Sequence, residues 1–278
     1  MNNIVDAQLE AAKRLRDRVE GMMGNVAGVT QNPVKFTGET GFAPPVACVC
    51  NPLTYAWPAF EEYVVRYGGT KKRVLFLGMN PGPWGMAQTG VPFGEIFVVR
   101  NWLEISAPIG RPDREHPKYP IDGYACKRSE VSGRRLWGLF MRRFETPEAF
   151  FREHFVANYC PLLFIAALNS ANGTEGARNL TPDRLTASER SRLYDACDEH
   201  LCALTEALQP EFVVGVGNFA AVRAEDALRR SAAATDRASQ NGKAIRIGKI
   251  LHPSPASPQS QVDWAGQATR QLQAQGIW

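Results

Sequence analysis

The sequence predicts an α/β fold in which a parallel sheet of four strands is covered by helices on both faces. Two observations support this prediction. Short apolar runs typical of buried strands alternate along the chain with segments of helical periodicity. Three of the four runs end in polar loops rich in proline or glycine, and such loops hold the ligands of open α/β sheets. One domain is expected over residues 1–278, with an N-terminal helix at 1–24, a loop at 25–45 and a core at 46–278.

The first elements are expected to be two helices and a strand. Residues 4–23 place apolar side chains three and four positions apart, which predicts an amphipathic helix. Residues 24–45 are rich in Gly, Thr, Pro and Asn and predict a loop. A second helix is expected at 56–68, because two glycines end the pattern there. The first strand follows at 73–78.

The middle of the chain is expected to start with an irregular, basic region that reaches to about residue 130. A helix with one apolar face follows at 132–144. Another is expected at 146–155, because it begins with a threonine cap and a proline at the first helical position. A second strand, interrupted by an asparagine and a proline, is expected at 155–165, and a loop at 168–182.

The last third of the chain continues the alternation of strands and helices. Its first helix begins with Thr186 and Glu189, a pair with the spacing of a capping box. Strands are expected at 211–217 and 244–251, and helices at 186–208, from 218 to about 231, and at 262–274.

The composition excludes several classes of protein. Hydrophobic residues make up 44% of the chain and charged residues 22%, as in ordinary globular proteins. No apolar run approaches the ~20 residues of a membrane span. The first residues lack the basic start and apolar stretch of a secretory signal, so an intracellular protein is expected.

The six cysteines indicate neither a disulfide framework nor a metal site. Disulfides are rare inside cells, and no C-x2-C pair occurs that would favour a metal centre. Cys48 and Cys50 are spaced as alternating positions of a strand. Buried or idle thiols are therefore expected at all six positions, which are Cys48, Cys50, Cys126, Cys160, Cys197 and Cys202.

The net charge of +4 is unevenly distributed. Residues 111–143 hold nine basic and four acidic residues, a charge of +5, which leaves about −1 for the rest of the chain. A surface that binds phosphate would use such an excess. A solvated basic face has the same composition, so charge alone leaves both interpretations open.

Three chain-distant side chains are expected to meet at one edge of the sheet, because the carboxyl ends of parallel strands lie together. The amide of Asn80 cannot act as a base, although its oxygen can hold a water. His252 can present an N–H to an oxygen that gains negative charge. Asn158 offers one acceptor and two donors, which is the pattern needed to read an amide-like edge.

The same loops disfavour two common hydrolytic reactions. They contain no paired carboxylates for glycoside hydrolysis, and Ser254 lies between prolines without a partner base. A reaction remains in which the leaving group departs early as an anion and a weakly activated water completes the cleavage. Hydrolysis of the N-glycosidic bond of a pyrimidine is such a reaction.

Two motifs resemble those of the single-strand-selective monofunctional uracil-DNA glycosylase family: GMNPGPWGMAQTGVPFGE at 78–95 and HPSPASPQ at 252–259. The likeness covers roughly residues 45–265. It continues through NPLTYAW (51–57), EVSGRRLWGLF (130–140), FVANYCPL (155–162), RNLTP (178–182) and VVGVG (213–217). The fold that the resemblance implies is the three-layer α/β/α sandwich of the uracil-DNA glycosylase superfamily, with its four-stranded parallel sheet.

The resemblance implies a DNA-repair enzyme that needs no cofactor and no metal. It would flip uracil, and by the same resemblance 5-hydroxymethyluracil, out of single- or double-stranded DNA. Cleavage would leave an abasic site and initiate base excision repair. The expected partner is DNA, with no membrane, and the expected state is a monomer. If the protein is bacterial, it is expected in the cytoplasm, associated with the nucleoid. If it is eukaryotic, it is expected in the nucleus.

The resemblance also implies residue roles. Asn80 would position the hydrolytic water, and His252 would stabilise the departing uracil anion through O2. Asn158 would accept from N3–H and donate to O4, so cytosine would leave it mismatched. The remaining residues expected to contact the base are Met79, Gly82, which would leave space beside C5, and Phe93, which would stack on the flipped base. The residues expected to contact DNA are Ser132, Gly133, Arg134, Pro253, Ser254, Pro255 and Ala256.

One position departs from the family pattern. An arginine of the loop after His-Pro-Ser-Pro commonly fills the space that the flipped base leaves, and this chain has Ala256 there. A methyl group cannot fill that gap, so single-stranded DNA is expected to be favoured more strongly. The alternative from another class is a non-catalytic nucleic-acid-binding domain of the same fold.

Overall fold

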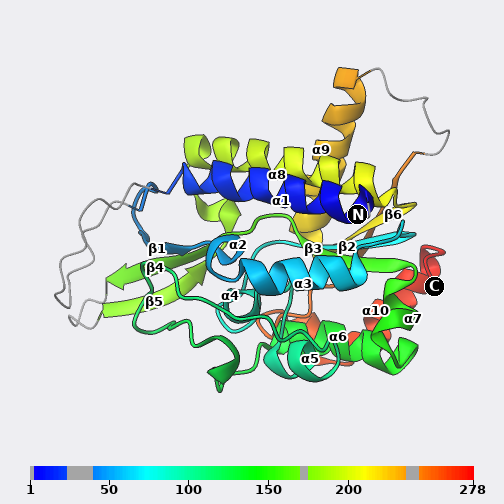
Figure 1. Ribbon diagram of the computed structural model, residues 1–278, viewed down its shortest axis with the longest axis horizontal. Helices are drawn as coiled ribbons and strands as arrows, with labels where there is room; N and C mark the ends of the chain where they lie inside the picture. Colours follow the sequence, from blue (N-terminus) through cyan, green and yellow to red (C-terminus); the bar gives the residue numbers. More distant parts are fainter. Residues whose placement is uncertain (1–2, 24–39, 170–174, 236–243) are drawn as a thin grey trace.

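The computed structural model describes residues 3–23, 40–169, 175–235 and 244–278, and it has an α/β architecture (Figure 1). A four-stranded parallel sheet lies between helices, as expected from the sequence. Most of the loop expected at 24–45 falls outside the described residues.

The parallel sheet contains the four strands that the sequence predicts, in the order β3-β2-β6-β7. All three pairings are parallel, and at the carboxyl edge Gly78 is paired with Asn158 and Val216 with Ile250. This edge therefore carries the loops that follow β2, β3 and β7. The strands are β2 (Val74–Gly78), β3 (His154–Asn158), β6 (Phe212–Val216) and β7 (Arg246–Ile250).

Helices cover both faces of this sheet (Figure 1). On one face lie α1 (Asn3–Glu20), α8 (Ala187–Leu208) and α9 (Asn218–Thr235). The other face carries α6 (Val131–Phe144), α7 (Pro147–Phe151) and α10 (Trp264–Ala274). The capping box of α8 is present, with both the Thr186 and the Glu189 side chains bonded to backbone N–H groups. None of the described helices is long and apolar enough to cross a membrane.

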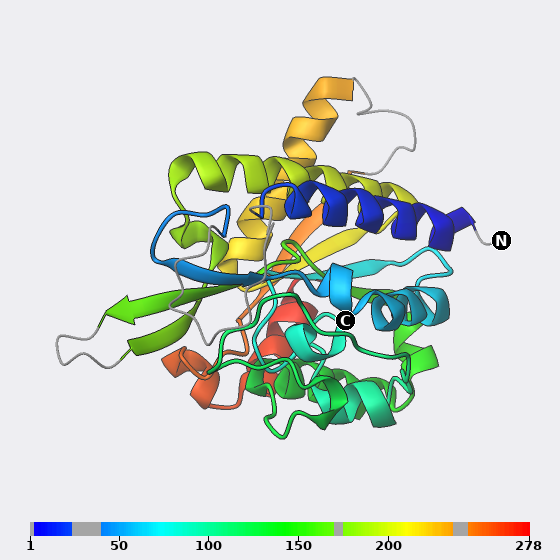
Figure 2. The ribbon, with the colours of Figure 1, turned by 60° about the vertical axis from the view of Figure 1, so that its left-hand side comes forward.

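A second sheet was not expected from the sequence. It is antiparallel, has the order β1-β4-β5, and extends away from the parallel sheet (Figure 2). Its strands are β1 (Val46–Cys50), β4 (Leu163–Asn169) and β5 (Glu175–Leu180). The expectation of a loop at 168–182 is therefore wrong.

The single strand expected at 155–165 is also wrong, because β3 and β4 belong to different sheets. After β3, the backbone N–H groups of Tyr159 and Cys160 still donate to Gly78 and Met79, each at 2.9 Å. Pro161 has no N–H and ends this pairing. The chain then enters the antiparallel sheet at Leu163.

The region expected to be irregular up to about residue 130 contains two short helices, α4 (Met86–Thr89) and α5 (Ile96–Asn101). The helix expected at 146–155 ends at Phe151, because Phe155 pairs with Leu75 in the sheet. Tertiary pairing outweighs helical propensity there. The remaining helical elements are α2 (Pro52–Tyr55), α3 (Trp57–Tyr67), and the short 3-10 turns η1 (Gly123–Ala125), η2 (Pro182–Arg184) and η3 (Pro258–Gln261).

An aromatic cluster holds α6 and α7 against the parallel sheet. The rings of Phe140 and Phe150 stack with centroids 4.4 Å apart, and Trp137 meets Phe140 edge-on at 5.7 Å. All three side chains are fully buried, and each contributes about 1.5–3 kcal/mol on burial. Phe140 also contacts Phe76 of β2, with ring centroids 4.9 Å apart, so this packing fixes α6 and α7 on one face of the sheet.

Candidate active site

The site is built where β2 and β3 end side by side. Gly78 closes β2, and Asn158, its partner in register, closes β3. A Cβ atom on Gly78 would lie less than 3.0 Å from both Oδ1 of Asn158 and the ring of Phe93. The missing side chain of Gly78 therefore lets an amide and an aromatic ring approach the same point, and sequence reasoning missed this residue.

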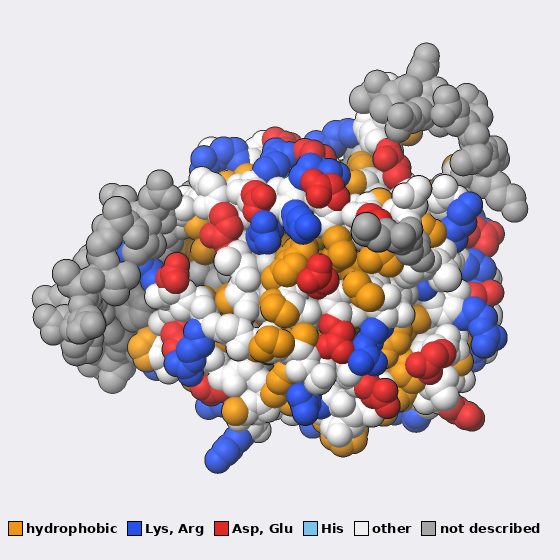
Figure 3. Space-filling view, viewed as in Figure 1, with side chains coloured by type: hydrophobic (Ala, Val, Ile, Leu, Met, Phe, Trp, Pro, Cys, Tyr) orange, Lys and Arg blue, Asp and Glu red, His pale blue; other side chains and the backbone are white. Residues whose placement is uncertain are grey.

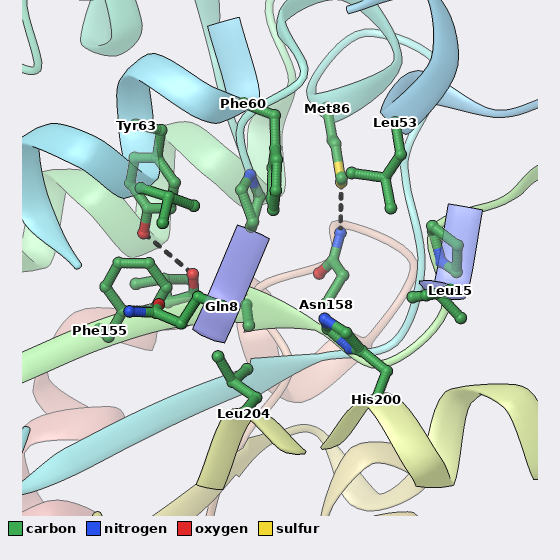
Figure 4. A pocket seen from close by; sticks show the side chains of 15 residues that line it. Gln8, Leu15, Leu53, Phe60, Tyr63, Met86, Phe155, Asn158, His200 and Leu204 are labelled. Carbon is green, nitrogen blue, oxygen red and sulfur yellow. Dashed lines mark hydrogen bonds between the residues drawn. The ribbon is translucent and has the colours of Figure 1, made fainter. Parts of the chain in front are cut away.

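The amide of Asn158 is only partly satisfied. Its Nδ2 donates to Sδ of Met86 at 3.2 Å, and its oxygen points away from that sulfur (Figure 4). Oδ1 is buried and has no hydrogen-bond partner in the described part of the chain. A buried unpaired acceptor costs about 1–3 kcal/mol, and thioether sulfur is a weak acceptor. The amide is thus available to a ligand that offers a donor and an acceptor.

Asn158 lines a small cavity together with side chains such as Phe155, His200 and Leu204 (Figure 4). Its volume is about 30 Å³. This is the space of about one water molecule, so the cavity cannot accept a pyrimidine. A base would have to approach Asn158 from the side of Phe93.

The imidazole of His252 is held by the backbone. Its Nδ1 accepts a hydrogen bond from the N–H of Ser254 at 3.0 Å. Burial lowers the pKa of His252 to about 4, so the ring is neutral near pH 7 and carries its proton on Nε2. The His252 and Phe93 ring centroids are 6.3 Å apart. Phe93 is thus the ring that Asn158 and His252 share as a neighbour.

Gly217 provides the space that His252 occupies. Its φ is +96°, and a Cβ atom there would lie 3.1 Å from Cβ of His252. Its N–H donates to the carbonyl of Ile250 at 2.9 Å, which ties the end of β6 to the strand that leads into His252. Strand β6 therefore supports the site without contributing a side chain to it.

Asn80 is oriented by the segment that links the two sheets. Its Nδ2 donates to the carbonyl of Leu162 at 3.1 Å. Within the described residues its Oδ1 accepts no hydrogen bond, so this oxygen is oriented and available to a water. Asn80 makes no hydrogen bond to Asn158 or His252; its link to them is the loop that begins at Gly78. Met79 joins this loop to the segment after β3 through its carbonyl, which accepts from Cys160 N–H at 2.9 Å.

Glu130 is a second residue that sequence reasoning missed. A Cβ atom on either Gly82 or Gly85 would lie less than 3.0 Å from its carboxyl oxygens. The carboxyl of Glu130 therefore occupies the space beside Gly82 that a side chain at that position would fill. Burial, and to a lesser extent the nearby Glu95, raises the pKa of Glu130 to about 7. Its only sequence signal is a lone acid just before α6.

The residues expected to contact DNA lie in two segments that the fold brings together. Arg135 joins these segments, because its guanidinium donates to the carbonyl of Pro253 at 2.9 Å and to Oγ of Ser260 at 3.3 Å. The segments are Ser132, Gly133 and Arg134 in the first turn of α6, and Pro253, Ser254, Pro255 and Ala256 after β7.

Within these segments the exposure differs. Arg134 and Ala256 are exposed, whereas Gly133 is buried. A Cβ atom on Gly133 would lie less than 3.0 Å from the carbonyl oxygen of Phe93. Helix α6 therefore packs directly on the loop that carries the aromatic ring, and Arg134 extends from that point to solvent.

Two arginines of the basic segment 111–143 are already engaged within the protein. Arg111 forms ion pairs with Glu115 at 3.2 Å and with Asp122 at 3.3 Å, and Arg143 lies over the Trp278 ring at 4.5 Å. On the face viewed in Figure 3, basic and acidic side chains are interspersed. The excess of charge is thus divided among several elements.

All six cysteines carry free thiols, as expected. Sγ of Cys48 lies 4.0 Å from Sγ of Cys50, which agrees with alternating positions of β1. No cluster of metal ligands occurs among the residues that the structure describes.

Comparison with known proteins identifies relatives over most of the chain. Residues 65–273 match the family model of the uracil DNA glycosylase superfamily. The chain is 46% identical over 271 residues to the single-strand selective monofunctional uracil DNA glycosylase of Mus musculus, covering 96% of this chain and 91% of the relative. The Rattus norvegicus protein of that name is 47% identical over 236 residues, covering 85% and 78% of the two chains.

A solved structure has the same fold. The crystal structure of Pedobacter heparinus SMUG2 matches with a TM-score of 0.58 and covers 94% of this chain and 97% of that chain. Its sequence identity is 17%, so this match concerns the fold alone.

Proposed function

Because this chain belongs to the single-strand-selective monofunctional uracil-DNA glycosylase family of the uracil-DNA glycosylase superfamily, we propose that it excises uracil from DNA. It hydrolyses the N-glycosidic bond, leaves an abasic site and initiates base excision repair. One observation carries the proposal. The unpaired Oδ1 of Asn158 lies beside Phe93 at the same sheet edge as a neutral His252.

Recognition of the base rests on complementary hydrogen bonds. Oδ1 of Asn158 accepts from N3–H of uracil, and Nδ2 exchanges its weak bond to Met86 for one to O4. Cytosine presents an acceptor and a donor in these places, so both atoms of Asn158 would be buried and mismatched. Phe93 stacks on the ring of the flipped base.

Cleavage proceeds by departure of the base. The C1′–N1 bond breaks, its electron pair leaves with uracil, and negative charge gathers on O2. Nε2–H of His252 donates to this oxygen, because Nδ1 is already occupied by the N–H of Ser254. A water held by Oδ1 of Asn80 then attacks C1′ and loses its proton to solvent. No strong base is required, since the sugar is already electron-deficient.

We also propose that 5-hydroxymethyluracil is a substrate. The carboxyl of Glu130 lies against Gly82, in the loop expected to pass beside C5. A group with a pKa near 7 can either donate to or accept from a hydroxyl there. The methyl group of thymine makes neither bond.

The test is incubation of the protein with single-stranded DNA that contains one uracil, followed by alkali to break the strand at abasic sites. Matched strands with cytosine or thymine in place of uracil are the controls. Breakage of the uracil strand alone is expected. Intact uracil strands would contradict the proposal and favour a non-catalytic DNA-binding domain, an alternative that the named glycosylase relatives do not favour.

A further inference from the structure

A groove with a volume of about 600 Å³ opens beside the loop that carries Asn80. Aromatic and charged side chains line it together, and most of them are at least partly exposed. The lining includes Trp84, Lys118, Tyr119, Asp122, Lys127 and Arg128.

The aromatic wall of this groove is ordered. The rings of Trp84 and Tyr119 lie 5.5 Å apart, and the guanidinium of Arg128 sits 4.6 Å from the centroid of the Trp84 ring. The hydroxyl of Tyr119 donates to the carbonyl of Ala177 at 3.1 Å, which anchors the ring to β5. A partly exposed pair of aromatic rings, tilted 40° to each other, is therefore held in place before any ligand arrives.

Gln88 fixes the second wall. This fully buried side chain donates to the carbonyl of Pro120 at 2.9 Å and accepts from the backbone N–H groups of Asp122 and Gly123 at 2.9 and 3.1 Å. Gln88 lies in α4, which directly follows the Asn80 loop. The groove and the site are thus built on one continuous segment.

The charge of the groove is positive. Its acid, Asp122, forms an ion pair with Arg111 at 3.3 Å. Lys127 and Arg128 are exposed and have no ion pair with the described acidic residues. Cations interleaved with aromatic rings are the chemistry by which proteins bind single strands, since phosphates meet charge and bases stack on rings.

We propose that this groove binds the nucleotide next to the target base in a single strand. Its base stacks on the wall formed by Trp84 and Tyr119, and its phosphate is neutralised by Lys127 and Arg128. Trp84 lies only two residues beyond Gly82, so a strand whose uracil occupies the site passes the groove. In a duplex the neighbouring base is already stacked and paired, so it cannot enter. The groove therefore favours single strands, and this inference rests on the proposed function.

The test combines a change in the protein with a change in the DNA. Single strands with one uracil carry a base-free spacer on its 5′ side, on its 3′ side, or on neither. With the wild-type protein, the spacer on one side raises KM about tenfold. Trp84→Ala raises KM about tenfold on the intact strand, and that spacer then adds no further loss. Trp84→Phe retains the effect of the spacer.

A matched control is Phe97→Ala, because this side chain is 61% exposed on α5, outside the groove lining. It leaves the spacer effect intact. The inference would be overturned if the spacer and Trp84→Ala raised KM independently, so that their effects multiply. It would also be overturned if Trp84→Ala raised KM equally on duplex DNA. Binding of strands with uncleavable 2′-fluoro-deoxyuridine is measured in parallel. Wild-type protein that cleaves no strand contradicts the proposed function instead, and its binding to these strands still tests the groove.

Discussion

The site at the sheet edge and the groove beside it are built in opposite ways. In the site, the polar groups proposed to act on uracil and on the attacking water are two amides and a neutral imidazole, with backbone groups bonded to Asn80 and His252. In the groove, the exposed guanidinium of Arg128 lies over the ring of Trp84, and Lys127 is exposed beside it in the chain. Neutral fixed dipoles suit a reaction whose charge develops only in the transition state, and mobile charges suit attraction of a polyanion. Cleavage and binding should therefore be separable by mutation.

The largest separation is expected from Asn80→Ala and His252→Ala. Each removes one fixed dipole, and loss of one such donor typically costs about 10²–10³ in rate. Single-turnover cleavage of a uracil strand measures this loss, and fluorescence anisotropy with an uncleavable strand measures binding. Binding is expected to change less than threefold. A variant that loses binding but cleaves normally at saturation would contradict the division between the two regions.

Gly78→Ala should damage the site while sparing the groove. Its Cβ would displace Oδ1 of Asn158 or the ring of Phe93, so kcat/KM on a uracil strand should fall more than tenfold. The matched control is Gly138→Ala in α6, where a Cβ meets only a guanidinium nitrogen at 3.5 Å. That change should leave kcat/KM unaltered and raise the free energy of unfolding by about 0.5–1 kcal/mol. Normal uracil excision by Gly78→Ala would show that Gly78 does not shape the site.

The pH dependence of cleavage and of stability should show that the imidazole of His252 is neutral in the site. Because burial lowers the pKa of His252 to about 4, its N–H donor is already neutral throughout pH 6–8, so titration of His252 should add no step to single-turnover rates there. Folding favours the neutral ring, so its contribution to stability is full above pH 6.5 and is lost as pH falls towards 4. A rate step near pH 6.5 that is absent in His252→Gln would contradict the neutral donor.

Glu130 should change stability with pH in the direction opposite to His252. Its raised pKa of about 7 means that the native state favours the protonated acid, so stability falls as pH rises from about 4.5 to 7. Glu130→Gln keeps the shape without the charge, and should therefore raise the melting temperature at pH 8 relative to wild type but not at pH 4. Melting curves at both values check this. Equal shifts at the two pH values would mean that the carboxylate is solvated.

The smallest effect is expected from Ala256→Arg. Ala256 is exposed in the loop after β7, outside the groove lining. A longer side chain there can fill the gap left by a flipped base. Cleavage of uracil in duplex DNA should rise a few-fold, with no change on single strands. Equal cleavage rates on matched single- and double-stranded substrates, unchanged by the substitution, would contradict the expectation that Ala256 makes the protein favour single strands.

The part of the site that follows from strand order could be predicted from the sequence. Asn80, Asn158 and His252 each come shortly after, or at the end of, an apolar run, and parallel strands place such ends together. The capping box of α8 could also be predicted, because its hydrogen bonds join residues that are close in the sequence.

The parts that depend on packing between distant segments could not be predicted. The run that contains β3 and β4 is apolar throughout, so nothing in it marks the change of sheet apart from Pro161. Arg135 is one of the nine basic residues counted in segment 111–143, yet it donates to the carbonyl of Pro253. Its role depends on the meeting of α6 with the loop after β7, which no local pattern encodes.

Gly78 and Gly217 give the protein two hollows, one filled by Asn158 with Phe93 and the other by His252. A relative with alanine in place of either glycine could keep every reactive group and still be inactive, because the added methyl group would fill the space. Reading activity from a genome by its reactive groups alone would then count inert copies as working ones. The empty positions have to be scored alongside the occupied ones.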